Sequence, residues 1–414
     1  MKRPSKKQVL VFMLAPPFPA VAGGDIYAIN ALVPFADQID YHLFCYVGGE
    51  IDIKKVADHK DQYDRVFKSV HLERRPPMPF QMPRIRRFIW LVSQVMRGLP
   101  FIDASYYSRS ALAAAKRLVR RYAIDAIEVN SAHLAFFRKY LRLPSLLVSH
   151  NIESDIFPFW MPAGLSGWKL RFMEWVAKRS RAAARAVELE NSFSFSAMTF
   201  ISSNDMTRVV AEVPKYLVPL YFEKSKVSYM QKPTDRFNVL WMGGFGWYPN
   251  AEGVIWFGNS IYPLLRDRLE SEHITLHFCG SHPPDELRQL HDGKNVLVHG
   301  FVEKIEPMLD QAHLLIVPLL SGAGIRVKII EAMSAGIPVL STSKGCEGVG
   351  AEDGRNIIVR DDPIAFAEEI VLAARDPLRL QVLSAGGLRL MSECYSEAVS
   401  LDAKREAYRD IGVL

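Results

Sequence analysis

The chain has 414 residues, 49% of them hydrophobic, and a formal net charge of +6 at pH 7, so it can bury large cores and should form two or more domains. It contains no apolar run of about 18 residues, which excludes a membrane-spanning helix. The four cysteines are scattered without metal-ligand spacing, as expected for a reduced cytoplasmic protein.

The first half of the chain alternates strand and helix patterns. The apolar run 9–14 follows several lysines, but it is too short for a signal peptide and stops at Pro16, so it predicts a buried strand. Further strands are expected at 41–47, 126–129, 145–149 and 197–201, and helices at 25–38, 104–122 and 168–195. Such alternation is typical of βαβ units with a parallel sheet.

The second half repeats this alternation after a proline-containing stretch, 204–235, which is expected to connect two domains. Strands are predicted at 237–242, 274–279, 296–299, 314–317 and 339–341, and a mostly helical segment at 250–269. The predicted architecture is α/β, with two Rossmann-like, doubly wound domains facing across a cleft. The expected boundaries are 1–222, 223–395 and a final helix, 396–414, with Val399, Ala403, Ala407 and Ile411 on one face.

The segment 321–343 is the most informative part of the chain. Gly322 and Gly324 precede a predicted helix over 325–335, and Gly336 and Pro338 end it. A helix that starts after a glycine turn directs unpaired N–H groups and a partial positive charge at an anion such as phosphate. Arg326 and Lys328 add two cations in the first turn. Cations there oppose the helix dipole, so a phosphate site explains them better than a solvated surface helix does.

This segment resembles the nucleotide-sugar segment of family 4 retaining glycosyltransferases (glycosyl transferases group 1), which have the GT-B fold. The matching pattern is Gly-x-Gly-x-Arg-x-Lys-x-x-Glu-Ala-Met-x-x-Gly-x-Pro-Val, over 322–339. By this resemblance Lys328 and Arg326 act on the donor diphosphate, and Glu331 binds the ribose hydroxyls. A solvated helix glutamate is the alternative for Glu331.

The resemblance continues through the second half. Residues 240–257 are similar to the family's strand, glycine turn and helix, in which Gly243 and Gly244 let the backbone approach the donor. Residues 298–302 resemble the segment that holds the nucleobase, which gives that role to Phe301 and Val302. A turn that serves geometry alone and an ordinary apolar strand end are the alternatives.

The sequence departs from the commoner family pattern at two places. Ala323 stands where many members carry a first glutamate, eight positions before Glu331. Gly244 and approximately Asn250 stand where many members carry an Arg and a Lys. We infer that Arg326 and Lys328 compensate, because a diphosphate leaving group needs cations or oriented N–H groups as its negative charge grows.

His150 follows a predicted buried strand and is similar to the family's histidine that contacts the donor sugar. Asn151 and Glu153 continue the same pattern with less defined roles. Gly23 and Gly24, before a predicted helix, resemble the family's first-domain glycine loop, which borders donor phosphate and acceptor. A structural histidine and a plain glycine turn are the alternatives.

The charges are unevenly distributed. Residues 1–230 hold 33 Lys and Arg against 20 Asp and Glu, whereas residues 231–414 hold 18 against 25. The stretches 74–92 and 159–185 mix basic with large apolar residues, which suits a helix lying on an anionic membrane surface or, alternatively, core-facing aromatics with a solvated face. No nucleic-acid-binding motif accompanies the charge.

The resemblance implies a metal-independent retaining glycosyltransferase that needs no cofactor besides its nucleotide-diphosphate-sugar substrate. The acceptor would be lipid-linked or a polysaccharide, in cell-surface glycan synthesis, and the enzyme cytoplasmic or peripheral on the inner membrane face. The alternatives are a same-fold epimerase or phosphorylase, and a catalytically weak nucleotide-sugar-binding partner subunit, suggested by Ala323. A nicotinamide oxidoreductase is disfavoured because neither glycine loop has the full Gly-x-Gly-x-x-Gly spacing.

Overall fold

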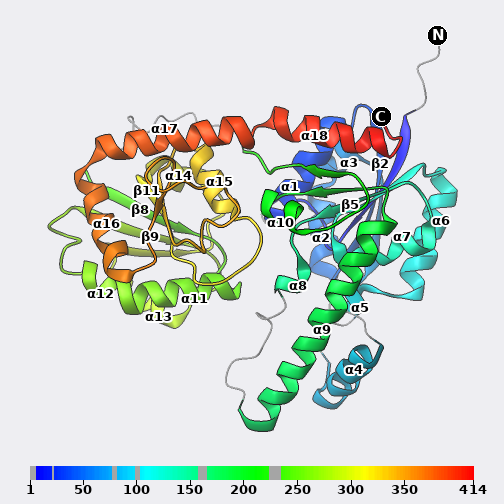
Figure 1. The fold of residues 1–414 in the computed structure, drawn as a ribbon, viewed down its shortest axis with the longest axis horizontal. Coiled ribbons are helices and arrows are strands. Elements are labelled where there is room, and N and C mark those ends of the chain that lie inside the picture. The colour runs from blue at the N-terminus through cyan, green and yellow to red at the C-terminus, as the bar shows by residue number, and fades with distance from the viewer. Residues whose placement is uncertain (1–5, 21–22, 77–81, 98–102, 157–165, 223–234) are drawn as a thin grey trace. The chain divides into compact units, whose positions relative to one another are not determined.

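The computed structural model describes residues 6–20, 23–76, 82–97, 103–156, 166–222 and 235–414 (Figure 1). The chain forms two compact units: Met1–Val218 together with Ser400–Leu414, and Pro219–Val399. Within the described residues, no helix is both long and apolar enough to cross a lipid bilayer.

The N-terminal unit contains a seven-stranded parallel sheet in the order β3-β2-β1-β4-β5-β6-β7. Its strands are β1 (Lys7–Met13), β2 (Ile39–Val47), β3 (Phe67–Arg74), β4 (Ala126–Val129), β5 (Ser145–Ser149), β6 (Ala197–Phe200) and β7 (Lys215–Leu217). Its helices are α1 (Gly23–Leu32), α2 (Glu50–Asp58), α3 (Lys60–Val66), α4 (Arg84–Arg97), α5 (Asp103–Tyr106), α6 (Arg109–Tyr122), α7 (Phe136–Leu141), α8 (Glu153–Ile156), α9 (Gly167–Ser194) and α10 (Ser203–Arg208), with 3-10 turns at Val33–Phe35 and Ala132–Leu134.

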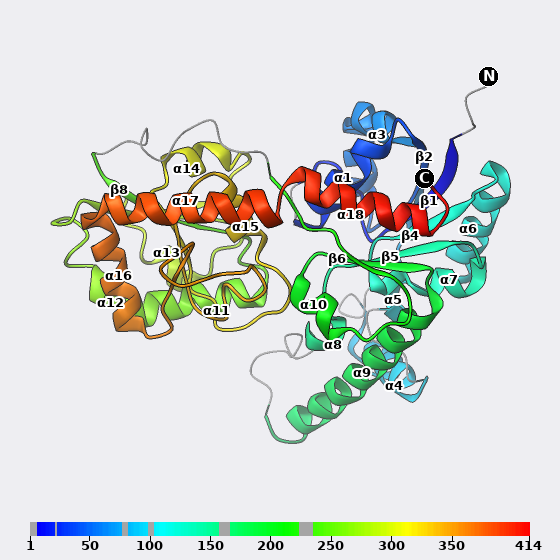
Figure 2. The same ribbon diagram turned by 45° about the horizontal axis from the view of Figure 1, so that its top comes forward.

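Alternate residues of β1 point into two different cores. Val9, Val11 and Met13 pack with α1, α3 and the C-terminal helix α18 (Glu397–Asp410), whereas Leu10 and Phe12 pack with α6 and α7 (Figure 2). A strand buried on both faces has to be apolar at nearly every position. This requirement explains the continuous run from which the first strand is predicted.

The C-terminal unit contains a six-stranded parallel sheet in the order β10-β9-β8-β11-β12-β13. Its strands are β8 (Phe237–Met242), β9 (Ile274–Cys279), β10 (Val296–Gly300), β11 (Leu314–Val317), β12 (Val339–Ser341) and β13 (Ile358–Val359). Its helices are α11 (Tyr248–Trp256), α12 (Tyr262–Leu265), α13 (Asp285–Arg288), α14 (Glu306–Gln311), α15 (Val327–Ser334), α16 (Pro363–Arg375) and α17 (Pro377–Cys394), with a π-helical turn at Phe257–Ile261.

Three strands, β3, β7 and β13, are missing from the sequence-based prediction. Most of β3 is only half-buried, so it lacks the apolar run of an inner strand, and β7 and β13 have three and two residues. The prediction of an irregular connection over 204–235 is wrong for its first part, which contains most of α10 and all of β7. The helix predicted at 104–122 is interrupted at Ser108, whose hydroxyl accepts a bond from the N–H of Ala111 and caps α6.

The buried face of α18 overlaps only partly with the predicted one, because Ala407 and Ile411 are buried as expected but Val399 is not. Ser400, Lys404, Ala407 and Tyr408 are buried on this helix, whereas Val399 is 37% exposed. The apolar pattern does not show the centre of this face because a lysine lies there. Lys404 is fully buried and lies 2.9 Å from the carboxylate of Glu128 on β4, and this ion pair places a charged residue in the core.

Candidate active site

Each sheet has one point at which the order of its strands reverses. In the N-terminal sheet this point lies between β1 and β4, and in the C-terminal sheet it lies between β8 and β11. Loops after such neighbouring strands run in opposite directions and leave a crevice outside the carboxyl ends of the strands. The candidate residues Gly243, Gly244, Gly322 and Gly324 lie in the two loops of the C-terminal switch point.

The first of these loops makes a tight turn directly after β8. Gly243 has φ +137°, a conformation that side chains rarely adopt, and its N–H donates to the carbonyl of Cys279. A side chain at Gly280 would lie 2.0 Å from the carbonyl oxygen of Gly243, so both glycines are needed for this close approach. Asn250, in the first turn of α11, donates to the carbonyl of Gly244 at 2.8 Å and fixes the turn to the helix.

The second loop follows β11 and leads into α15. Gly322 and Gly324 have φ of +120° and +73°. The guanidinium of Arg326 donates to the carbonyl oxygens of Ala323 and Gly324 at 2.6 and 2.7 Å. Arg326 is 8% exposed, so this structure places its cation against the loop, where it shapes the backbone before the helix begins.

Lys328, in the first turn of α15, reaches the first loop. Its ammonium lies 2.9 Å from Oδ1 of Asn250 and 4.8 Å from the ring centre of Trp241. A side chain on Gly243 would lie 2.8 Å from this nitrogen. Burial, with the charge of Arg326 as a second cause, lowers the pKa of Lys328 to about 7. The ammonium of Lys328 therefore lies at the first loop, beside Asn250, which stands approximately where many family members carry a charged residue.

Glu331 lies one turn further along α15. Burial, with the neighbouring Glu306 as a second cause, raises the pKa of Glu331 to about 7. After β10, Phe301 is 69% exposed, and Val302 packs against the main core of the unit. An exposed aromatic ring at a strand end is suited to stacking on a planar ligand, whereas Val302 has the environment of a core residue.

The N-terminal switch point gathers a second set of candidates. His150 follows β5, and its Nε2 lies 3.0 Å from Oδ1 of Asn130, which follows β4. Gly24 in the first turn of α1 faces the same ring, because a side chain there would lie 3.9 Å from Nδ1 of His150. Gly23 begins the helix. Burial lowers the pKa of His150 to about 4, so the imidazole is neutral at physiological pH.

Glu153 and Asn151 have local partners. Glu153 lies 3.2 Å from Nε2 of His133, and Asp103 lies 2.7 Å from Nδ1 of the same ring. Burial alone would lower the pKa of His133, but the two carboxylates outweigh it and raise the pKa to about 10. The carbonyl of Asn151 accepts a bond from the hydroxyl of Ser149. Glu153 is therefore part of a charged cluster that holds α8 in place.

Sequence reasoning missed the roles of two residues of the C-terminal site. Asn250 holds Lys328 and the first loop together, as described above. Glu252 on α11 accepts hydrogen bonds from the hydroxyls of Ser321 and Tyr248 and so brings a carboxylate to the glycine loop that has Ala323 in place of a glutamate. The spacing of Tyr248 and Glu252, four residues apart in a helix after a glycine turn, was the available signal.

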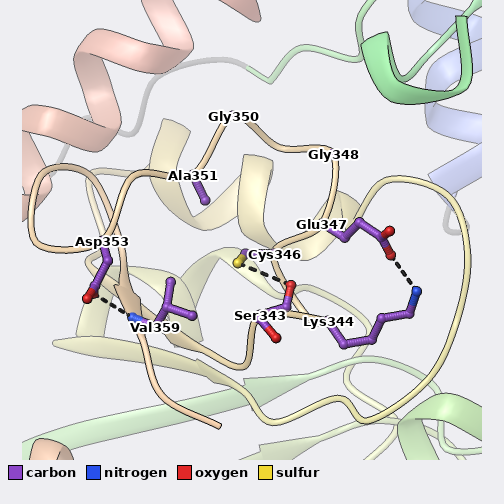
Figure 3. A pocket seen from close by; sticks show the side chains of 9 residues that line it. All are labelled: Ser343, Lys344, Cys346, Glu347, Gly348, Gly350, Ala351, Asp353 and Val359. Carbon is purple, nitrogen blue, oxygen red and sulfur yellow. Dashed lines mark hydrogen bonds and ion pairs between the residues drawn. The ribbon is translucent and has the colours of Figure 1, made fainter. Parts of the chain in front are cut away.

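A separate hollow of about 750 Å³ lies in the C-terminal unit, between the end of β12 and the start of β13 (Figure 3). Lys344 and Glu347 form an ion pair at its rim, and the thiol of Cys346 donates to the carbonyl of Ser343. None of the candidate residues predicted from the sequence lines this hollow.

The fold and the two switch points define a GT-B protein, as solved structures confirm. HepE of Anabaena, in complex with UDP, matches 97% of this chain and 99% of its own with a TM-score of 0.64 at 15% identity. Sucrose-phosphate synthase of Thermosynechococcus elongatus matches 98% of this chain and 99% of its own with a TM-score of 0.66 at 16% identity.

The family resemblance is also confirmed. Residues 236–376, which include both glycine loops of the C-terminal unit, match the family described as Glycosyl transferases group 1. A relative described as an uncharacterized 44.6 kDa protein in the cps region of Klebsiella pneumoniae is 23% identical over 403 residues, which cover 94% of this chain and 96% of the relative.

Proposed function

We propose that this protein is a retaining, metal-independent glycosyltransferase that moves a sugar from a nucleotide-diphosphate-sugar to a glycan or lipid-linked acceptor. One observation carries the proposal: the ammonium of Lys328 is held by Asn250 where the two glycine loops meet. A cation with few polar partners in a partly buried site is costly in the free protein, and a diphosphate would compensate it.

Different residues of the C-terminal unit contact different parts of the donor. Lys328 neutralises the diphosphate as its charge grows, and the partial positive charge at the start of α15 adds to this stabilisation. Arg326 shapes the loop and contributes its charge, Glu331 accepts from the ribose hydroxyls, and Phe301 with Val302 borders the nucleobase. HepE binds UDP and UDP-glucose in its crystal structures, which makes UDP-sugars the first donors to test.

His150 is the proposed contact to the sugar in the N-terminal unit. A neutral imidazole at the carboxyl end of β5, facing Gly24, can exchange a hydrogen bond with a sugar hydroxyl. In a retaining transfer, the departing phosphate helps deprotonate the acceptor hydroxyl on the same face of the sugar. The protein's share is orientation and charge stabilisation.

A role in cell-surface glycan synthesis is favoured by the cps region named for the Klebsiella relative. We also propose a cytoplasmic protein whose N-terminal unit contacts an anionic membrane surface through α4 and α9. On α4, Ile85 and Ile89 are 76% and 61% exposed, and on α9 Trp175 is 41% exposed beside Arg179. Residues 77–81 and 159–165 of the predicted surface lie outside the described residues.

Membrane contact is tested by sedimentation with vesicles. We expect binding to vesicles containing an anionic lipid, weakening from 0.1 to 0.5 M salt, and loss of binding in an Ile85→Ser, Ile89→Ser double variant. Equal binding to neutral and anionic vesicles would contradict the anionic surface.

The donor is tested by screening nucleotide-sugars for those that raise the melting temperature, since a ligand at 100 times its Kd adds about 2.7 kcal/mol. Product analysis by mass spectrometry and NMR with the stabilising donor then shows whether sugar reaches an acceptor and with which anomeric configuration. The chosen variant is Lys328→Met, and Lys344→Met, at a lysine paired with Glu347 in the separate hollow, is its matched control.

We expect Lys328→Met to lose binding and transfer while Lys344→Met keeps both. Conversion of the donor sugar without an acceptor would favour an epimerase instead. Binding without turnover across a panel of acceptors would favour the partner-subunit alternative.

A further inference from the structure

A chain of buried polar groups connects the C-terminal helix α18 to His150. The ammonium of Lys404 lies 2.9 Å from Oε1 of Glu128, and Nδ2 of Asn130 donates to the same oxygen at 3.2 Å. Oδ1 of Asn130 then lies 3.0 Å from Nε2 of His150. Lys404 and Glu128 are both fully buried. Nothing in the donor site described above uses these three residues.

The direction of each hydrogen bond follows from the carboxylate at the centre. An ionised carboxylate can only accept. One oxygen of Glu128 forms the ion pair with Lys404 and accepts from Asn130, and the other accepts from the hydroxyl of Tyr408 at 2.7 Å. The hydroxyl of Tyr41, 2.9 Å from that of Tyr408, must then donate to it. Two hydrogen-bond donors and the buried cation of Lys404 around one carboxylate stabilise its negative charge.

This arrangement fixes the amide of Asn130. Its NH2 group must face Glu128, so its oxygen must face His150, and an amide oxygen can only accept. The Nε2 of His150 is therefore the protonated nitrogen. Nδ1 keeps its lone pair, and the Nδ1 edge of the ring faces Gly24 at the start of α1.

We propose that Lys404, Glu128 and Asn130 are positioning residues that hold the His150 imidazole as the Nε2–H tautomer and present Nδ1 as a hydrogen-bond acceptor at the start of α1. The ligand group that fits is a hydroxyl donor, such as a hydroxyl of a sugar. The consequence for sugar transfer rests on the proposed function, whereas the tautomer does not. The lowered pKa of His150 agrees with a neutral ring.

The tautomer can be measured by NMR on the full-length protein with 15N-labelled histidine side chains, in which the two ring nitrogens of a neutral imidazole give different shifts. The His150 signal is assigned by its loss in His150→Gln. In the wild type we expect a protonated Nε2 and an unprotonated Nδ1. In Glu128→Gln, the new amide can either donate or accept, so Asn130 can turn over and we expect a mixture of both tautomers.

Tyr408→Phe is the matched control. It removes one donor from the same carboxylate but leaves the orientation of Asn130 unchanged, so the tautomer should remain as in the wild type. Asn130→Leu is the second test variant, in case Glu128→Gln folds poorly. It removes the amide oxygen that accepts from Nε2, so we expect a mixture of both tautomers in this variant as well.

With an active donor and acceptor, Glu128→Gln should lower kcat/KM by about ten- to a hundredfold, the scale of a misplaced contact group, and Tyr408→Phe should not. An Nδ1–H or doubly protonated His150 in the wild type would overturn the inference, as would an unchanged tautomer in both test variants. If no nucleotide-sugar supports transfer while the tautomer behaves as expected, the proposed function fails and the positioning of His150 stands.

Discussion

The protonation of Lys328 should control donor binding. Its pKa falls from 10.5 to about 7, which corresponds to about 5 kcal/mol by which the site disfavours the ammonium. A diphosphate that binds only the charged form should therefore bind about tenfold more weakly at pH 9 than at pH 8, a window in which Glu331, with its pKa of about 7, is already ionised. A nucleotide-sugar is the right ligand because its diphosphate has no proton of its own to lose in this range.

Isothermal titration with UDP-glucose, in buffers of different ionisation enthalpy, measures both the affinity and the proton taken up. We expect uptake approaching one proton per ligand at pH 8, and in Lys328→Met a weaker affinity that does not change from pH 8 to pH 9. Wild-type affinity that stays constant from pH 6 to 9, with no proton uptake, would refute the reasoning.

The same residue should reduce stability. Since the pKa of Lys328 is lower in the folded than in the unfolded chain, the unfolded chain binds one more proton between pH 7 and 10.5, and the wild-type free energy of unfolding rises with pH through that window. Lys328→Met should therefore be more stable below pH 7 and lose this advantage by pH 10.5. After allowing for partial solvent exposure and the lost partner of Asn250, we expect a gain of about 1–3 kcal/mol in urea unfolding. A loss of stability at pH 6 would contradict this result.

Three further substitutions test the structure. Gly243→Ala places a methyl group 2.8 Å from the ammonium of Lys328 and should weaken nucleotide-sugar binding at least about tenfold in titrations; Gly246→Ala, with open space around it, should not. Glu331→Gln should cost about 1.5–3 kcal/mol in nucleoside diphosphate binding but leave binding of inorganic pyrophosphate unchanged, and an equal loss for both would exclude a ribose contact. Lys404→Met leaves the buried carboxylate of Glu128 without its cation and should lower the free energy of unfolding in denaturant by about 3–5 kcal/mol. Replacing Glu128 by Leu in the same chain should recover most of this loss. No recovery would mean that the two residues are not coupled.

The inner strands and the glycine loops could be predicted because short-range chemistry determines them. A strand such as β11 is buried along its whole length and apolar throughout, and the break between β11 and α15 is marked by glycines. The outer strands β3, β7 and β13 are short or half-buried, so no local pattern distinguishes them from loops.

The candidate site, too, could be predicted from the sequence only in part. The sequence places Lys328 near a phosphate-binding helix start, but it cannot show that the ammonium reaches Asn250, 78 positions earlier. It also cannot show that Arg326 turns back onto its own loop, or that Lys404 lies inside the core. Long side chains reach groups that are distant in sequence, and their partners depend on the packing of whole elements.

The return of the last residues to the first unit has a consequence for biosynthesis. The C-terminal unit comes from one uninterrupted stretch of chain, whereas the N-terminal unit needs Ser400–Leu414 to complete its core. At translation rates of 5–20 residues per second, the roughly 180 intervening residues take about 9–36 s to make. During that interval the nascent protein carries an unneutralised acidic side chain on β4 and an open apolar groove. Premature termination before residue 400 should thus yield a product that cellular quality control recognises and degrades.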